Sequence, residues 1–231
     1  MRNLILELGM LLLCSTLVLA SEKATNLNET DQKLAATSLS ELAASADLVA
    51  VAQVRDTDYS YTRSFPSEGK AFLRILIPYK LNKPKLEMIE VYEKGLHQNE
   101  CYFKSPTVLE EGRRYLVFLQ IDPEDPENYR GLKQGCALEI LVTGNNRYAL
   151  KYPVEGINIS DNLNELATKL EFHDNYALVA GEDLDPSDRD DLLTRGLIIP
   201  YQGKFKYTHG VDLTTARGLI PAKALKSQSR W

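Results

Sequence analysis

The chain has 231 residues, a formal net charge of −5 and a hydrophobic fraction of 44%, which is an ordinary composition for a globular protein. The acidic balance argues against a nucleic-acid partner, because proteins that bind nucleic acids usually present a basic surface. The length suits one domain with appendages, or one and a half domains.

Residues 1–20 have the pattern of a secretory signal peptide. Arg2 gives a short positive start, an uncharged and mostly apolar run follows, and small residues precede a cleavage position between Ala20 and Ser21. A retained membrane anchor is the alternative, but the apolar run is shorter than the roughly 20 residues that span a bilayer. Lipidation at Cys14 is a weaker alternative, because a bulky leucine precedes that cysteine. We therefore expect export, to a periplasm or to the medium.

Removal of the signal peptide would also remove Cys14 and leave two cysteines, Cys101 and Cys136. An even pair of cysteines in an exported chain predicts a disulfide bond. In the chain-entropy model, this cross-link would stabilise the fold by roughly 3–4 kcal/mol. Two free thiols are the alternative, but the chain has no Cys-x-x-Cys motif and an oxidising compartment does not preserve thiols.

The part of the chain before Pro153 is dominated by patterns that favour strands. Residues 21–37 are polar and are expected to be mobile, and Ser38 with Glu41 forms a capping box that predicts a helix. Six short apolar runs follow, and their spacing predicts a small barrel or sandwich. These runs are Leu48–Val54, Ala71–Leu81, Glu87–Tyr92, Tyr115–Ile121, Leu138–Val142 and Arg147–Tyr152. Pro78 in the second run predicts an edge position or a β-bulge, and the Gly-Asn-Asn sequence at 144–146 predicts a hairpin turn.

Residues 153–231 change in character and are expected to form a mixed α/β extension. The apolar spacing over Leu163–Leu170 predicts a helix. Asp185, which a proline follows, is a typical N-cap, and Gly196 suits the end of the helix that Asp185 begins. Two short strand-like pieces come next, at Leu197–Tyr201 and Phe205–Tyr207.

Two sequence patterns in the first part resemble those of a known family. One is Ala-Asp-x-Val-x-Val-x-x-Val over Ala46–Val54, and the other is Gly-x-x-Tyr-Leu-Val-Phe-Leu over Gly112–Leu119, with Cys101 in the loop between them. Their order resembles the netrin-module (NTR-like) domains, similar to the tissue inhibitors of metalloproteinases, that occur in exported bacterial proteins. The resemblance covers about Ser38–Tyr152. It implies a five- to six-stranded Greek-key barrel of the OB type with a flanking helix.

The same resemblance does not extend to the device by which the animal inhibitors act. Those proteins place a cysteine at the mature N-terminus on the zinc ion of the target protease. Here the predicted terminus is Ser21, and no cysteine lies near it. Zinc chelation by the N-terminus is therefore not expected.

Aromatic residues gather in residues 56–70, a stretch whose polar character predicts a loop or a long hairpin tip. They are Tyr59, Tyr61 and Phe65. Barrels of the OB type often bind ligands on one face and its bordering loops, so these side chains are candidates to stack on a sugar or a peptide. The alternative is that they cover one end of the barrel.

Acidic residues cluster at Asp122–Glu127 and at Asp183–Asp191. Calcium requires oxygen-rich loops, but a solvated loop and an acidic helix N-terminus account better for these two clusters. Charge is also divided in the extension, since Gly181–Asp191 has six acids and one arginine, whereas Gly203–Trp231 has six basic residues and one acid. Either these two segments complement each other, or the basic end meets an acidic partner or an anionic surface.

Catalytic motifs are missing from the sequence. It contains no G-x-S-x-G, H-E-x-x-H or G-x-x-x-x-G-K-[ST] pattern. The three histidines, His97, His173 and His209, lie in polar surroundings without a spaced nucleophile and are too scattered to bind zinc. We therefore predict no catalytic residue, no metal ligand and no cofactor.

The sequence favours an exported, non-enzymatic module that binds another protein, with no membrane span after signal cleavage. One alternative is an inhibitor of an extracellular protease that does not use an N-terminal cysteine, which depends on analogy of fold. A second alternative is an exported hydrolase whose site has no recognised motif. Glycosylation patterns at Asn28 and Asn158 would matter only in a eukaryotic source.

Overall fold

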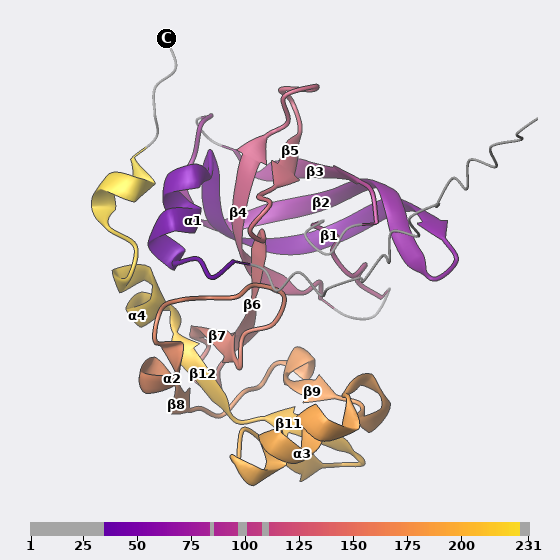
Figure 1. Cartoon of the computed structure of the whole chain (residues 1–231), viewed down its shortest axis with the longest axis vertical. Coiled ribbons are helices and arrows are strands. Elements are labelled where there is room, and N and C mark those ends of the chain that lie inside the picture. The colour runs from indigo at the N-terminus through magenta and orange to yellow at the C-terminus, as the bar shows by residue number, and fades with distance from the viewer. Residues whose placement is uncertain (1–34, 84–85, 97–100, 108–110, 227–231) are drawn as a thin grey trace, which may run out of the picture. The chain divides into compact units, whose positions relative to one another are not determined.

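The structure is a computed structural model that describes residues 35–83, 86–96, 101–107 and 111–226 (Figure 1). These residues belong to one compact unit. The expected signal peptide with its cleavage position at Ala20 and Ser21, the polar segment up to residue 34, Asn28 and His97 lie outside the described residues.

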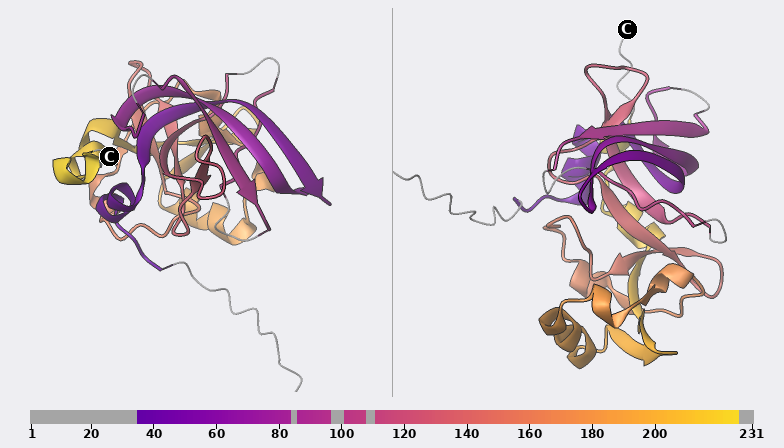
Figure 2. Two further views of the ribbon diagram at one scale, coloured as in Figure 1. Left: turned by 90° about the horizontal axis from the view of Figure 1, so that it is seen from above. Right: turned by 90° about the vertical axis from the view of Figure 1, so that its right-hand side faces the viewer.

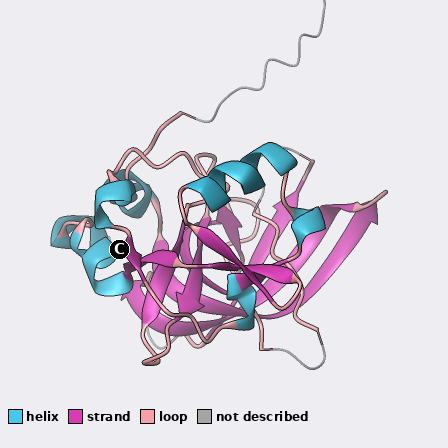
Figure 3. Cartoon of the chain, turned by 90° about the horizontal axis from the view of Figure 1, so that it is seen from below, coloured by secondary structure: helices cyan, strands magenta, loops and turns pink. Residues whose placement is uncertain are grey.

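Strands dominate the described residues, and short helices lie around them (Figure 3). The helices are α1 (Leu39–Ser45), α2 (Leu163–Leu166), α3 (Pro186–Thr194) and α4 (Leu213–Gly218), and the 3₁₀ turns are η1 (Asn175–Ala177), η2 (Gly181–Asp183) and η3 (Ala222–Leu225). The strands are β1 (Leu48–Thr62), β2 (Phe65–Lys80), β3 (Met88–Lys94), β4 (Arg114–Ile121), β5 (Tyr129–Gly131), β6 (Ala137–Val142), β7 (Tyr148–Tyr152), β8 (Thr168–Lys169), β9 (Leu178–Val179), β10 (Ile198–Tyr201), β11 (Lys204–Tyr207) and β12 (His209–Asp212).

Five strands close into a barrel in the order β1-β2-β3-β5-β4, and β4 returns to pair with β1. All pairings are antiparallel except that of β3 with β5, which is parallel through Val91 and Tyr129. The first seven residues of β1 are buried without alternation. This part of the strand pairs with β2 on one edge and with β4 on the other. One of its faces packs into the barrel interior, and the other packs against helix α1. The mainly β fold with an OB-like barrel and flanking helices is therefore confirmed.

The sheet does not stop at the barrel. One edge of β4 pairs with β1, and the other edge is divided: its second half pairs with β5 and its first half with β6. From β6 the sheet continues through β7 and β12 to β8, which makes nine strands in total. The expectation that six runs close into one barrel needs correction, because β6 and β7 leave the barrel and the three-residue β5 replaces them. Strand β5 is too short to give a periodic signal in the sequence.

The chain after Tyr152 returns to the barrel sheet (Figure 1). Strand β12 pairs with β7 from His209 opposite Tyr152 to Asp212 opposite Ala149. Helix α4 contacts β7 and β12, and η3 packs against α1. Leu213, Ala216 and Ile220 consequently belong to the same buried cluster as α1. Residues late in the chain thus complete the core of the barrel sheet.

The helix predicted over Leu163–Leu170 is only partly present. Helix α2 ends at Leu166, where the amide of Ala167 donates to the carbonyl of Leu163, and the chain then becomes extended. Strand β8 follows, and the amide of Leu170 donates to the carbonyl of Thr208 at 2.8 Å. The second half of the predicted helix is therefore extended, because hydrogen bonds to the free edge of β12 outweigh the helical spacing of its apolar side chains.

A second, three-stranded sheet lies beside α3, in the order β10-β11-β9 (Figure 1). The side chain of Asp185 accepts a hydrogen bond from the amide of Ser187 at 2.8 Å and begins α3, as predicted. Gly196 follows the helix with a φ of 69°, a left-handed conformation that favours glycine. The predicted strands at 197–201 and 205–207 are confirmed as β10 and β11.

Helix α1 is held at both ends. The capping box is present: the hydroxyl of Ser38 accepts from the amide of Glu41 at 3.1 Å, and the carboxylate of Glu41 accepts from the amide of Ser38 at 2.8 Å. Asp161 accepts a hydrogen bond from the amide of Leu39 at 2.7 Å. At the other end, the buried ammonium of Lys80 donates to the carbonyl of Ala43 at 3.0 Å, and burial lowers the pKa of Lys80.

Pro78 lies on a free edge of β2, as its place in an apolar run predicts. At this point β2 pairs with β1 alone, because the pairing with β3 ends at Arg74. Proline is therefore accepted on an edge that needs no amide donor. The register with β1 also shifts between Val49 and Ala50, next to Pro78.

Among the described residues, no helix combines the length and the apolar character that crossing a membrane requires.

The predicted disulfide joins Cys101 to Cys136, with 5.9 Å between their Cα atoms. It fastens the segment that precedes β4 to the beginning of β6. Gly131, in β5, lies directly beside it, since an added Cβ would come within 2.7 Å of the Cβ of Cys101 and 2.9 Å of the carboxylate of Glu93. The absence of a side chain at Gly131 thus lets the disulfide approach the barrel wall.

We expect the Cys101→Ser/Cys136→Ser variant to lose about 3–4 kcal/mol of unfolding free energy, because the cross-link closes a long loop and restricts the unfolded chain. Urea denaturation of the oxidised protein and of the variant measures this difference. The reduced wild-type protein is the control and should unfold at the same urea concentration as the variant. Equal stability of the oxidised protein and the variant would contradict the expectation.

Candidate functional site

The stretch 56–70 is not a loop. It forms the outer part of a β-hairpin in which Asp56–Thr62 pairs with Phe65–Phe72. Arg63, at the turn, has a φ of 59°. Strand β3 pairs with β2 only as far as Glu68, so the end of the hairpin projects past β3 (Figure 2). The prediction of a long hairpin tip is confirmed, and the alternative of an irregular loop is wrong because both arms pair throughout.

The three candidate aromatic residues in this hairpin have different surroundings. Tyr59 is partly covered: its ring lies edge-on to that of Tyr102, with 5.1 Å between centroids, and its hydroxyl accepts a hydrogen bond from the amide of Phe103 at 3.1 Å. Burial raises the pKa of Tyr59. Tyr61 and Phe65, in contrast, are 60% and 67% exposed. Tyr59 therefore anchors the hairpin, whereas the other two side chains face solvent.

A further apolar residue lies near the end of the hairpin. The amide of Gly95 donates to the carbonyl of Ser67 at 2.9 Å, which places the following residue, Leu96, close to the hairpin. Leu96 is 57% exposed. We call Tyr61, Phe65 and Leu96 the hairpin patch. It contains half of the large hydrophobic side chains that are exposed among the described residues, the others being Met88, Ile199 and Tyr201.

A cleft of about 600 Å³ lies between the barrel sheet and α3. Strands β4, β6 and β7 contribute its floor, and the segments around η2 and α3 contribute one wall. Apolar side chains, among them Val154, Val179 and Leu192, alternate with charged ones around it. No local sequence pattern predicts a site here, because the floor and the wall come from parts of the chain that are far apart in sequence.

Ion pairs connect the charged residues of the cleft floor. The ammonium of Lys151 lies 2.7 Å from the carboxylate of Glu139 and 3.1 Å from that of Glu155. Arg113 pairs with the other oxygen of Glu139. The hydroxyl of Tyr207 donates to Glu155 at 3.0 Å. The side chains of Lys151 and Glu139 are only 7% and 13% exposed, so the centre of this network is buried, whereas Glu155 at its border is 60% exposed.

Tyrosine rings support the two cations of the floor. The guanidinium of Arg113 lies 4.5 Å from the ring centroid of Tyr176, and the ammonium of Lys151 lies 4.8 Å from that of Tyr207. Such cation–π contacts are attractive because the ring face carries negative potential. Burial, together with the nearby carboxylates, raises the pKa of Tyr115 and of Tyr207. These phenols therefore keep their protons above the pH at which an exposed tyrosine ionises.

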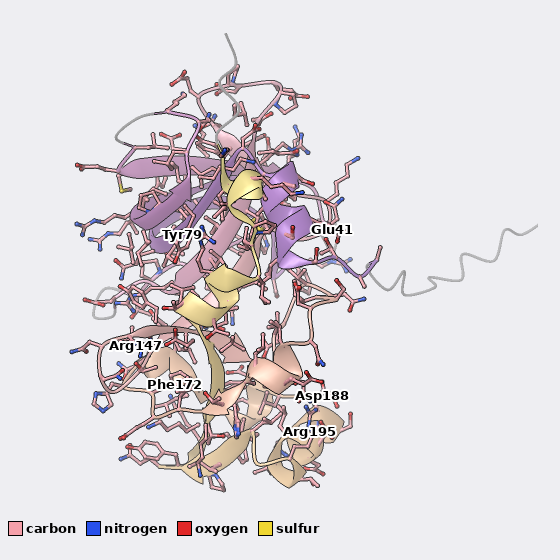
Figure 4. All side chains as sticks on the ribbon, turned by 90° about the vertical axis from the view of Figure 1, so that its left-hand side faces the viewer. Glu41, Tyr79, Arg147, Phe172, Asp188 and Arg195 are labelled. Carbon is pink, nitrogen blue, oxygen red and sulfur yellow. A yellow bond between two sulfur atoms is a disulfide. The ribbon has the colours of Figure 1, made fainter. Side chains whose placement is uncertain are left out.

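The wall formed by η2 and α3 is acidic. Asp183, Asp185, Asp188 and Asp191 all line the cleft. Asp191 pairs with Arg195 at 2.8 Å, and Asp185 caps the helix. Figure 4 labels Asp188 and Arg195, which lie near the beginning and just past the end of α3. The described residues of the lining include six carboxylates and four cations, so the balance of charge among them is negative.

The remaining candidate residues serve local structure. In the first acidic cluster, Asp122 accepts from the amide of Glu124 at 2.9 Å and Asp125 from that of Glu127 at 3.1 Å, so these acids form turns. His173 and His209 lie outside the cleft lining. Within the described ranges, no group of three or more histidine, cysteine, aspartate or glutamate side chains could hold a metal ion.

One signal in the sequence could have revealed part of the cleft floor. The hairpin turn at 144–146 sets a register in which Ile140 faces Leu150, and the next pair outward is Glu139 and Lys151. Opposite charges at matched positions of two otherwise apolar strands predict a cross-strand ion pair. The contributions of Arg113 and Tyr207 could not be found in this way, because no local register relates them to the hairpin.

No protein-family model matches the chain, and neither a curated protein nor a solved structure shows significant similarity to it. The hairpin patch and the cleft are therefore the features from which a function can be inferred.

We expect Lys151→Met to lower the unfolding free energy by about 3 kcal/mol, because it leaves the buried carboxylate of Glu139 with one cation fewer. Thermal and urea denaturation measure the loss. Lys70→Met is the matched control: Lys70 pairs with Glu90 at 2.6 Å, but both side chains are over a third exposed, and a pair of this kind contributes less than about 1 kcal/mol. If both variants lose the same unfolding free energy, Lys151 contributes no more to stability than an exposed ion pair does, and the expectation is wrong.

The buried tyrosines of the cleft predict a loss of stability at alkaline pH. A pKa raised in the folded state means that the unfolded chain loses its phenolic protons first, so stability is complete below the ordinary tyrosine pKa of 10.0 and falls as the pH rises above it. Melting temperatures recorded from neutral pH upward should decline beyond this value. Tyr115→Phe should decline less steeply, and an identical slope for this variant would contradict the role of Tyr115.

Proposed function

We propose that the protein is an exported, non-enzymatic interaction module of the NTR-like type, and that it binds a partner protein through the hairpin patch. The observation that carries the proposal is the exposure of Tyr61 and Phe65 at the end of a hairpin that is otherwise anchored to the barrel. Export is supported by the signal-like sequence of residues 1–20 and by a disulfide bond, which persists in oxidising compartments.

Exposed apolar side chains that gather in one place favour a binding surface over an ordinary surface. Single exposed hydrophobic residues are common on soluble proteins, but contiguous groups of them mark interaction sites. Tyrosine and phenylalanine are enriched in the cores of protein interfaces. In the hairpin patch both residue types stand at the end of the hairpin, but on its two faces, because Tyr61 pairs with Pro66 whereas Phe65 pairs with Thr62. Leu96 is an exposed aliphatic residue near the same end.

The backbone that carries these exposed side chains is ordered by strand pairing and by the contacts of Tyr59. Its arms pair from Asp56 to the turn, and Tyr59 attaches it to the segment that carries Cys101 through Tyr102 and Phe103. A surface that is already ordered loses little conformational entropy on binding. Charged residues border it, since Lys94 lies 3.5 Å from Glu68, and polar borders of this kind surround the apolar centre of many interfaces.

The protease-inhibitor alternative would use the same surface. The predicted mature terminus has no cysteine to reach a catalytic zinc ion, so inhibition would have to come from the hairpin blocking the protease cleft. A panel of extracellular proteases assayed with the purified protein separates this case from binding to a partner that is not a protease.

The hydrolase alternative is less well supported. The cleft does bring titratable groups together, but the described residues that line it include no serine, threonine, cysteine or histidine. Glu139 and Glu155 are both engaged by Lys151, which holds them as ion-pair partners. This arrangement favours binding over nucleophilic catalysis.

We expect a photo-activatable amino acid at position 61 or 65 to cross-link one defined partner in the native envelope. The Tyr61→Ser/Phe65→Ser variant should bind that partner at least about tenfold more weakly, because truncation of two central aromatic residues commonly costs over 2 kcal/mol. Its melting temperature should be unchanged, because neither side chain is buried.

The matched control for this experiment is Ile199→Ser/Tyr201→Ser, which removes two other exposed apolar side chains from β10. It should keep full affinity. A defined partner that binds both double variants equally well would contradict the assignment of the hairpin patch, and so would cross-linking that is equally strong at position 199.

A further inference from the structure

We propose that the cleft between the barrel sheet and α3 is a second binding site, separate from the hairpin patch, and that it takes an organic cation: an ammonium or guanidinium group on an apolar stem. The cleft has the size for such a ligand, since its volume of about 600 Å³ lies within the roughly 300–1,000 Å³ of small-molecule sites. Apolar walls and a few fixed polar groups, both present here, are also typical of such sites.

The charge balance of the cleft selects a cation. Among the four cations of the described lining, Lys151 and Arg113 are neutralised by the network of the floor and Arg195 by Asp191. The fourth, Lys104, forms no ion pair with a described residue. On the acidic wall, Asp183 and Asp188 form no ion pair with any residue in the described part of the chain. Concave surfaces with an excess of one charge concentrate ligands of the opposite sign.

The floor supplies a carboxylate that is held in place. Both contacts of Glu155, from Lys151 and from Tyr207, end on its Oε1 atom. Its Oε2 atom makes no hydrogen bond with the described residues, and the side chain is 60% exposed at the cleft. A carboxylate oxygen that is fixed in position and still open to solvent is well suited to accept a charge-assisted hydrogen bond from a cation.

The buried network itself is better explained by a binding role than by stability. Replacing buried ion pairs by apolar side chains is often neutral or stabilising, because the charges must be removed from water. Lys151 is nevertheless 93% buried, with two carboxylates and a tyrosine ring around it. What this arrangement provides is a fixed orientation of Glu139 and Glu155 beneath the acidic wall.

The apolar part of the lining suits the stem of such a ligand. Val154, Val179 and Leu184 line the cleft together with the charged groups. A bare divalent cation is a poorer match: calcium takes six to eight oxygen ligands, whereas no group of three metal-binding side chains converges among the residues that the structure describes. An ammonium or guanidinium needs only one or two carboxylates.

The same chemistry could come from a free small cation or from a lysine or arginine side chain of a peptide. Isothermal titration of the protein with L-arginine amide, with spermidine and with a tri-arginine peptide distinguishes these sources. We expect binding that weakens as NaCl is added. Binding of the free cations identifies a small-molecule site, and binding of the peptide alone identifies a peptide site.

Charge-neutralising variants test the location of the site. Asp183→Asn/Asp188→Asn and, separately, Glu155→Gln should weaken binding at least fivefold and leave the fold intact by circular dichroism. Asp58→Asn, an equal charge change on the hairpin, should leave the affinity unchanged, and so should Tyr61→Ser/Phe65→Ser. The proposal is overturned if none of the three cations binds at millimolar concentration, if glutamate binds as well as they do, or if Asp58→Asn weakens binding equally.

Discussion

The divided edge of β4 is the constraint on which the rest of the structure depends. One edge of this strand closes the barrel against β1, and the other is shared between β5 and β6. The division point coincides with the disulfide, because the amide of Phe118 donates to the carbonyl of Cys136 at 2.7 Å. The barrel and the longer sheet thus have one strand in common, and the cross-link fixes the place where they separate.

Both candidate surfaces follow from that arrangement. Strand β6 leaves the barrel and pairs with β7, which places Glu139 and Lys151 side by side at the cleft floor. Strand β12 then joins β7 and brings Tyr207, just before it, over the same floor. On the other side, β2 is longer than its neighbour β3, and this difference in length leaves Tyr61 and Phe65 of the hairpin patch uncovered.

Local features of the fold could be predicted from the sequence. Ser38 with Glu41, Asp185 and Gly196 mark helix ends through hydrogen bonds and backbone angles that span only a few residues. The pairing of Cys101 with Cys136 followed from counting the cysteines that remain if residues 1–20 are removed as a signal peptide. The aromatic residues of the hairpin were found as a group, although the separate role of Tyr59 depends on contacts with Tyr102 and Phe103.

Features that depend on distant parts of the chain could not be predicted. Strand β5 owes its existence to the edges of β3 and β4 rather than to its own three residues. The spacing of Leu163–Leu170 favours a helix, but the exposed edge of β12 supplies hydrogen bonds that turn its second half into β8. The cleft could not be predicted for the same reason, because its floor and its acidic wall are brought together by the pairing of β12 with β7.

Native-state hydrogen exchange tests most directly whether β4 and the returning chain form one cooperative structure. If they do, the amides of β4, β7 and β12 exchange with the same free energy of opening, equal to that of global unfolding. If β12 and α4 open at a much lower free energy while β4 stays protected, the returning chain is a separate appendage, and the cleft floor is not the fixed surface described above.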